Sequence, residues 1–399
     1  MQDALKAQQI TDRVWWVGAI DWDIRDFHGY MTGRGTTWNA YLILGDEPVL
    51  IDTVKPSGKA EMMARIASVI EPESIRHLIS NHTEMDHSGS IPDVVRAIRP
   101  QQLLASQLGA KGLPAHFDVG MEITPVSDLE TLRLGDASLT FVETRMVHWP
   151  DSMFTYFAED QVLFSSDGFG MHLASQQRFA DELPAEVLEH EAAKYFANIL
   201  LLYAPQLTKL LGKVKGLNLP LKTIAPDHGP VWRRDLGQVI DRYAHWAEQK
   251  LTMKAVVLYD SMWDSTKLMA KAIGEGLAEG GADPRLMWAR GCHRSDVMAE
   301  LLDAGALIVG GPTLNNGLFP TLADHLTYIR GLRPRNLVGA AFGSYGWSGE
   351  AVKAIEEHLT AMDVELVEEG LRVKWVPTAD DLVRSRDLGL AVAHRMTSE

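Results

Sequence analysis

Four ionisable side chains are crowded into the stretch SNHTEMDHSG at residues 80–89. His82 and Glu84 lie two residues apart, so in an extended segment both side chains point to the same side. Asp86 and His87 follow where the chain must turn into an amphipathic segment. Burying several ionisable groups is costly without a cation to neutralise them. The stretch therefore predicts a metal site.

Three further candidates stand where later apolar runs end: His148 in MVHWPD, Asp167 in FSSDGFG and His228 in APDHGP. Glycine or proline follows each of them closely, so each side chain is expected on a loop at the end of a strand. Loops held by a rigid sheet often carry functional groups. Together with the first stretch they supply four histidines and three carboxylates, enough for two metals with one bridging carboxylate.

The ligand types also bear on which metal is bound. Two adjacent zinc ions held mainly by imidazole promote hydrolysis, whereas mixed carboxylate and histidine ligation with open positions suits redox-active iron. Glu84 and Asp86 favour iron. A dinuclear zinc hydrolase with an accessory nucleotide-binding domain stays open as an alternative.

Three loops in the second half could together hold one phosphate-bearing ligand. DSMWDSTK at residues 260–267 is rich in hydroxyls where a phosphate would meet the N–H groups of a helix N-terminus. GPTLNNG at 311–317 and GSYGWSGE at 343–350 also follow apolar runs, and ligands collect beyond the carboxyl ends of parallel strands. Trp347 and Trp263 could stack on an aromatic ring. The predicted ligand-binding residues are Ser261, Met262, Trp263, Asp264, Ser265, Thr266, Pro312, Thr313, Leu314, Asn315, Asn316, Gly317, Ser344, Tyr345, Gly346, Trp347, Ser348 and Gly349.

The elements that must position these groups follow from the apolar pattern. In the first half, WNAYLILGDEPVLIDTV predicts a hairpin, residues 59–70 a helix, and residues 75–80 a buried strand that ends just before His82. Further strands are expected at 139–146, 161–166 and 221–226. A long helical region at 183–214 is expected to break at Pro205.

From about residue 254 the pattern changes to strand, turn and helix in regular alternation. Strands are expected at 254–262, 304–313 and 336–347, with helices at 266–281 and 322–332. This alternation is typical of a parallel sheet with helices on both faces. We therefore expect two domains, 1–250 and 251–399.

The composition of the chain excludes several classes of binding partner and several locations. A formal charge of −15 repels nucleic acid backbones and anionic lipid surfaces, so neither is an expected partner. The longest apolar segment, residues 198–205, is far shorter than the ~20 residues that span a bilayer, and residues 1–13 lack a signal-peptide core. The single cysteine, Cys292, excludes an intramolecular disulfide and a four-thiolate metal site. A cytoplasmic protein is expected.

The pattern His-x-Glu-x-Asp-His at 82–87, followed by His148, Asp167 and His228, resembles flavodiiron proteins over essentially the whole chain. The resemblance implies an α/β chain in which a metallo-β-lactamase-like αββα sandwich precedes a flavodoxin-like doubly wound sheet that binds FMN. It implies that one iron is bound by His82, Glu84 and His148, and the other by Asp86, His87 and His228, with Asp167 bridging. His28 and His172 would lie just outside these ligands.

By the same resemblance the chain would be an oxidoreductase that passes electrons through FMN to a diiron centre. Its reaction would be reduction of dioxygen to water, nitric oxide to nitrous oxide, or both. The family implies a head-to-tail homodimer, and Trp149, beside His148, is expected near its contact. Because a single cysteine cannot build an attached rubredoxin, free rubredoxin is the expected donor, with a reduced deazaflavin as the alternative. A non-catalytic electron carrier is the remaining alternative.

Overall fold

The computed structural model describes residues 4–250 and 252–397, which fold as two compact units. Of the described residues, the first unit comprises 4–28, 32–195 and 205–244, and the second comprises 29–31, 196–204, 245–250 and 252–397. The predicted division at 250 stays a prediction, and its limits 1, 251 and 399 lie outside the described residues. None of the helices in the described part of the chain is long and apolar enough to cross a bilayer.

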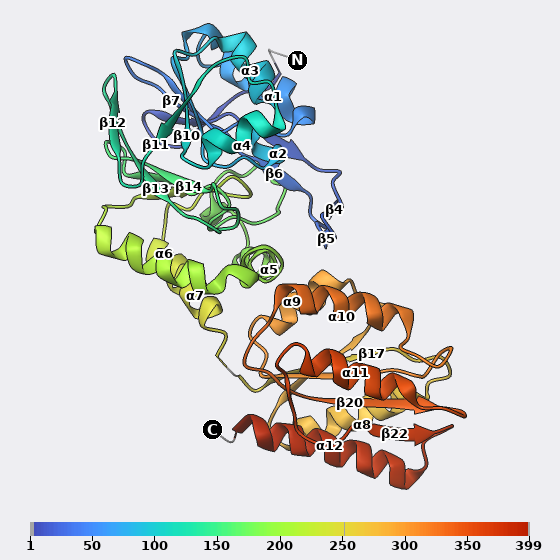
Figure 1. Ribbon diagram of the computed structural model, residues 1–399. Coiled ribbons are helices and arrows are strands. Elements are labelled where there is room, and N and C mark those ends of the chain that lie inside the picture. Colours follow the sequence, from blue (N-terminus) through green and yellow to red (C-terminus); the bar gives the residue numbers. More distant parts are fainter. Residues whose placement is uncertain (1–3, 251, 398–399) are drawn as a thin grey trace. The chain divides into compact units, whose positions relative to one another are not determined.

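Two sheets form the centre of the first unit (Figure 1). The larger has the order β1-β2-β7-β8-β9-β10-β11, and its strands from β8 onward are parallel. Its strands are β1 (Gln8–Gln9), β2 (Val14–Trp16), β7 (Tyr41–Ile43), β8 (Val49–Ile51), β9 (His77–Ser80), β10 (Gln102–Ser106) and β11 (Ile123–Val126). The antiparallel pair β7 and β8 is the predicted hairpin, with Leu42 opposite Leu50.

The second sheet has the order β12-β13-β14-β15-β16, antiparallel except for its last pair. Its strands are β12 (Thr131–Leu134), β13 (Ala137–Glu143), β14 (Met153–Phe157), β15 (Val162–Phe164) and β16 (Thr223–Ala225). Shorter strands are β3 (Ala19–Asp21), which pairs with β6 (Thr36–Trp38), and β4 (Asp26–Phe27) and β5 (Tyr30–Met31).

Side-chain alternation explains why these layers stack. Tyr41 and Ile79 of the first sheet face the second sheet and pack with residues such as Phe164. Their neighbours Leu42 and Leu78 point the other way, into a core shared with the outer helices. Those helices are α1 (Lys59–Ala67), α3 (Ile91–Ile98) and α4 (Gly109–His116).

Helices also line the far side of the second sheet. Figure 1 places α6 (Ala204–Leu217) and α7 (Leu236–Glu248) there, following α5 (Ala185–Tyr195). A π-helical turn (Phe196–Leu200) and a 3-10 turn (Leu201–Tyr203) interrupt the long helical region, so the break lies before Pro205 and not at it as predicted. Pro205 lies in the first turn of α6, where its missing N–H costs no intrahelical bond. The first unit is thus the predicted αββα sandwich.

The second unit is built on a parallel sheet of order β18-β17-β19-β20-β21, with β22 also paired to β20. Its strands are β17 (Lys254–Tyr259), β18 (Asp283–Trp288), β19 (Ala306–Gly310), β20 (Val338–Tyr345), β21 (Glu365–Leu366) and β22 (Leu371–Lys374). The helices α8 (Ser265–Glu279) and α12 (Ala379–Thr397) cover one face, and α9 (Arg294–Leu301), α10 (Pro320–Leu332) and α11 (Glu350–Thr360) cover the other (Figure 1). The strand order is that of a flavodoxin-like doubly wound fold.

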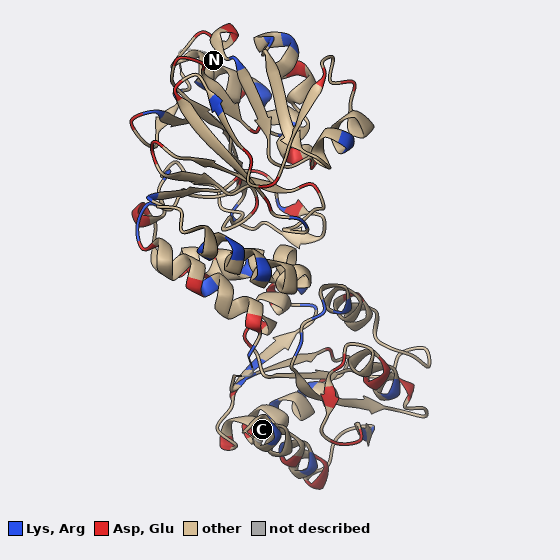
Figure 2. Ribbon diagram, turned by 60° about the vertical axis from the view of Figure 1, so that its left-hand side comes forward, with Lys and Arg blue, Asp and Glu red and all other residues tan. Residues whose placement is uncertain are grey.

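Helices α8 and α12 pack backbone against backbone. A Cβ atom added to Gly276 would lie 1.9 Å from the carbonyl oxygen of Arg386, and one added to Gly389 would lie 2.1 Å from that of Ile273. Only glycine permits this approach. Figure 2 shows that charged residues gather on the helices and loops of both units, while the sheets are mostly free of them.

Candidate diiron and flavin sites

The seven predicted metal ligands come from strand-end loops of both sheets. His82 and Glu84 follow β9, and the short helix α2 (Met85–Ser88) carries Asp86 and His87. The loop between β13 and β14 supplies a histidine, and the loops after β15 and β16 supply the rest: His148, Asp167 and His228. All seven side chains are buried except that of His148, which is partly buried. The structure brings them together in two groups, of four and three residues.

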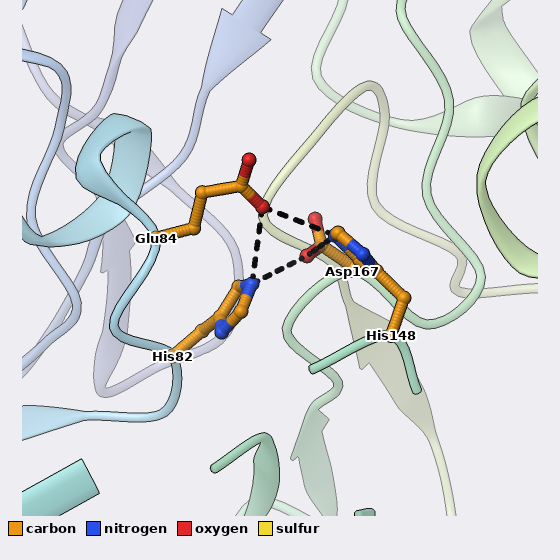
Figure 3. A group of neighbouring side chains, drawn as sticks. All are labelled: His82, Glu84, His148 and Asp167. Carbon is orange, nitrogen blue, oxygen red and sulfur yellow. Dashed lines mark hydrogen bonds and ion pairs between the residues drawn. The ribbon is translucent and has the colours of Figure 1, made fainter. Parts of the chain in front are cut away.

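In the first group, two imidazole nitrogens face two carboxylate oxygens (Figure 3). His82 Nε2 lies 3.3 Å from Glu84 Oε2 and 3.4 Å from Asp167 Oδ2. His148 Nε2 lies 3.1 Å and 3.2 Å from the same two oxygens. The four ligand atoms thus surround one point.

The second group repeats this arrangement. His87 Nε2 lies 3.4 Å from both Asp86 Oδ2 and Asp167 Oδ1, and His228 Nε2 lies 3.3 Å and 3.2 Å from these oxygens. The two oxygens of Asp167 therefore face different groups, as a bridging carboxylate requires.

The spacing fits metal ligation better than hydrogen bonding. An N–H group donates to one oxygen at about 2.9 Å, whereas each nitrogen here faces two oxygens at 3.1–3.4 Å. Ligands about 2.1 Å from a metal, at angles of about 90–110°, are about 3.0–3.4 Å apart. Both oxygens of buried Asp86 and both nitrogens of His87 lack a hydrogen-bond partner among the described residues. These residues fit two metal ions.

Outer residues orient several of the ligands. Asp151 Oδ2 lies 3.3 Å from His82 Nδ1 and accepts a 2.7 Å hydrogen bond from the N–H of Thr83. The Thr37 carbonyl lies 2.9 Å from His228 Nδ1, and the hydroxyl of buried Tyr195 donates to Asp167 Oδ1 at 2.9 Å. Such partners fix ring orientation and strengthen metal binding.

Charge at the centre is balanced within the donor set. Burial by itself lowers the pKa of His87, but the charges of Asp86 and Asp167 raise this pKa to about 9. Burial acts to raise the pKa of Asp167, yet the charge of His87 and the close contacts with His148 and His228 hold this pKa well below its usual range. Asp227 differs, because burial raises its pKa to about 6. Metal cations would displace the protons that the histidines carry.

His28, His172 and Trp149 also lie close to the predicted metal ligands. His28 is largely exposed, yet its Nε2 lies 3.2 Å from Glu84 Oε1. His172 is buried, with Nδ1 2.8 Å from Thr36 Oγ1 and its ring centroid 4.7 Å from that of His228. Trp149 packs edge-on against the ring of His82, with centroids 5.1 Å apart.

A cavity of about 430 Å³ opens at the carboxyl ends of the strands in the second unit. Its volume suits a drug-sized ring system. Exposed tryptophans form part of its wall, and the ring centroids of Trp347 and Trp375 are 6.4 Å apart. The predicted residues that line it are Met262, Trp263, Ser265, Pro312, Thr313, Asn315, Asn316, Ser344, Tyr345, Gly346, Trp347 and Ser348.

The other predicted flavin residues do not line this cavity: Ser261, Asp264, Thr266, Leu314, Gly317 and Gly349. Leu314 and Gly317 close their loop on each other through backbone hydrogen bonds of 3.1 and 3.0 Å. Gly349 precedes α11.

The first flavin loop provides a place for a phosphate. Asp264 precedes α8 with φ 62°, and the N–H groups of the first turn of a helix have no intrahelical acceptor. Ser261 Oγ is buried without a hydrogen-bond partner among the described residues, and Thr266 Oγ1 lies 2.9 Å from Ser344 Oγ. The donors present fit a phosphate group such as that of FMN.

Comparisons with known proteins match both halves of the chain. Residues 36–229 match the model of the ODP family beta lactamases, and residues 257–389 match flavodoxin. A nitric oxide reductase of Moorella thermoacetica is 45% identical over 97% of this chain and 98% of its own length. The rubredoxin-oxygen oxidoreductase of Megalodesulfovibrio gigas is 43% identical over 99% of both chains. The crystal structure of the flavodiiron protein from Giardia intestinalis superimposes with a TM-score of 0.95 at 33% identity, over 98% of this chain and 97% of that chain.

The chain belongs to the flavodiiron protein family. It is an oxidoreductase whose cofactors are FMN and a diiron centre, as the sequence predicts. Membership confirms the two predicted folds and does not favour the dinuclear zinc hydrolase.

Sequence reasoning missed four residues of this flavodiiron chain. Trp375 and Val376 line the flavin cavity directly after β22, and the strand-end rule that found the other loops also applies to them. Asp151 lies three residues after His148 and could have been considered a partner of a ligand. Tyr195 sits within a helix and carries no comparable signal.

Proposed function

We propose that this flavodiiron chain reduces dioxygen to water, and also nitric oxide to nitrous oxide, at its diiron centre. The main support for this proposal is that Asp167 presents one oxygen to each of two ligand groups, so two ions can be held side by side. Dioxygen is proposed as the main substrate. When bound, the two irons and the flavin would supply the electrons and the Lewis acidity for gas reduction.

The proposed ligand assignment follows the two groups. His82, Glu84 and His148 would hold one iron, Asp86, His87 and His228 the other, and Asp167 both. His87 is included because its Nε2 has the same pair of carboxylate neighbours as that of His228.

The protein residues around these ligands keep them in place without metal. Asp151 and the Thr37 carbonyl set the ring planes of His82 and His228, and Tyr195 holds one oxygen of Asp167. Because these groups are buried, bulk water is excluded from the ligands and the charges act over a short range at low dielectric.

The FMN would occupy the cavity lined by Trp347 and Trp375, with its phosphate at the loop from Ser261 to Thr266. We propose all eighteen sequence-predicted residues as contacts or as supports of these loops, together with Trp375 and Val376.

Rubredoxin is the proposed electron donor, supported by the name of the relative that is 43% identical over nearly the full chain. A head-to-tail homodimer that brings one subunit's flavin beside the partner's irons, with Trp149 near the contact, is a further proposal, as is a cytoplasmic location.

The test combines composition with turnover. Anaerobically purified protein should contain two irons and one FMN per chain, and should consume dioxygen and nitric oxide when reduced by a rubredoxin system. His82→Ala should lower turnover of both gases, whereas His190→Ala, at an exposed position of α5, should not. Two zinc ions with no bound flavin would refute the proposal. Unchanged turnover of both gases in His82→Ala would show that the metal ligands are not needed for gas reduction, which would refute the proposed diiron site.

A further inference from the structure

A buried carboxylate lies at the start of the phosphate loop. Asp260 follows β17 directly and has no exposed surface. Its Oδ1 accepts hydrogen bonds from the Ser261 N–H at 2.6 Å and from Trp288 Nε1 at 3.3 Å, and its Oδ2 accepts one from the Thr321 hydroxyl. These neutral donors orient the carboxylate but do not cancel its charge.

The cation that meets this carboxylate is Arg290, in the loop after β18. Its Nε donates to Asp260 Oδ1 at 2.9 Å, and another guanidinium nitrogen donates to the Ser261 carbonyl. The guanidinium carbon lies 5.1 Å from the ring centroid of Trp288 and 5.7 Å from that of Phe319. Stacking on these rings and the two hydrogen bonds place the positive charge of Arg290 beside Asp260, although the Arg290 side chain is partly exposed.

The buried charge of Asp260 lies next to the loop that is proposed to bind the flavin phosphate. A flavin phosphate carries nearly two negative charges and would sit beside residues 261–266, next to a second buried anion. Like charges held near each other at low dielectric repel strongly. The Ser261 N–H is also directed to Asp260, so it is not available to offset the phosphate charge.

We propose that Arg290 is a positioning residue for flavin phosphate, which acts by neutralising Asp260 at the start of the loop. The inference rests on the proposed FMN site. It goes beyond that site because Arg290 does not line the flavin cavity.

A purely mechanical role is the competing explanation, since Arg290 also ties down the Ser261 carbonyl. The two explanations differ for riboflavin, which has the same ring system but no phosphate. Loss of a mechanical tie weakens both flavins, whereas loss of charge neutralisation weakens FMN alone. Removing the carboxylate as well should then restore FMN binding.

The experiment measures Kd for FMN and for riboflavin by fluorescence quenching with the full-length protein after removal of flavin. Arg290→Met should raise the Kd for FMN about tenfold or more and leave that for riboflavin within about twofold. Arg290→Lys, which keeps the charge, should retain most of the FMN preference. Arg290→Met combined with Asp260→Asn should bring the Kd for FMN back to within about threefold of wild type.

Arg285→Met is the matched control, because Arg285 is similarly exposed and pairs with Asp283 at 2.7 Å. It should change neither Kd. The inference is overturned if Arg290→Met shifts both flavins equally, shifts neither, or is not rescued by Asp260→Asn. If the wild-type protein binds neither flavin, the proposed FMN site itself is refuted. If the wild type binds FMN but Arg290→Met keeps the wild-type preference for FMN over riboflavin, only the role of Arg290 is refuted.

Discussion

Replacing Asp151 by Asn should loosen one of the two irons and leave the other in place. The Asp151 carboxylate lies 3.3 Å from Nδ1 of His82, which belongs to the first ligand group only. Asparagine has nearly the same volume and can still accept from the Thr83 N–H, so the loop should keep its shape. What is lost is the negative charge that polarises the imidazole.

The magnitude follows from the usual cost of such a change. Removing a partner of a metal-bound histidine weakens metal binding by about 10- to 100-fold, or about 1.4–2.7 kcal/mol. The second group contains His87 and His228, and neither contacts Asp151 by hydrogen bond or ion pair among the described residues. We therefore expect two separate release steps where the wild type shows tight retention of both irons.

The assay is anaerobic competition with a ferrous chelator, followed by absorbance as its concentration is raised. One iron per chain should leave at a chelator concentration about 10- to 100-fold lower than the wild type requires. Asp128→Asn is the control, because that carboxylate pairs with Lys213 on the surface at 2.6 Å. Release of both irons at the wild-type concentration, or of both together at a lower one, would refute the reasoning.

Four further outcomes are expected. In iron-free protein the pKa of His87 is raised to about 9, so between about pH 6.5 and 9 the folded state binds more protons than the unfolded state. The stability that this proton contributes is complete below about pH 6.5 and is lost as pH rises through about 9. Urea unfolding at several pH values measures this loss. Tyr195→Phe removes the hydrogen bond to Asp167 and should weaken iron retention by about 1.5–3 kcal/mol in the chelator assay. Trp347→Ala should raise the Kd for FMN about tenfold in a flavin titration, because an exposed stacking surface is removed. Gly389→Ala should cost about 1–3 kcal/mol in chemical unfolding, since the added carbon would meet the Ile273 carbonyl at 2.1 Å.

Local sequence signals located the ligand-bearing loops well. His82, Asp167 and His228 each follow an apolar run, and the structure places each of them two or three residues after the end of a strand. His148 lies farther out, in the middle of the loop between β13 and β14, because β13 ends at Glu143, earlier than predicted. Their grouping in space could not be derived from spacing, because it depends on how two sheets with different strand orders stack. The family resemblance supplied it.

Supporting residues were harder to find, for a physical reason. Tyr195 reaches Asp167 from a helix of the same unit, and a buried tyrosine in a helix looks like ordinary core. Asp260 and Arg290 are separated by thirty residues and meet only because β17 and β18 are parallel neighbours. Strand β18 was not predicted, since its residues are largely exposed and lack a clear apolar run.

The backbone contact between α8 and α12 constrains how this protein can diverge. Helix α8 begins at the phosphate loop, and its position along the sheet is set by two glycines, Gly276 and Gly389, that admit no side chain. Mutations in the last helix can therefore alter cofactor retention without touching the flavin. A variant of this kind would lose the yellow colour of its flavin during purification and keep its iron.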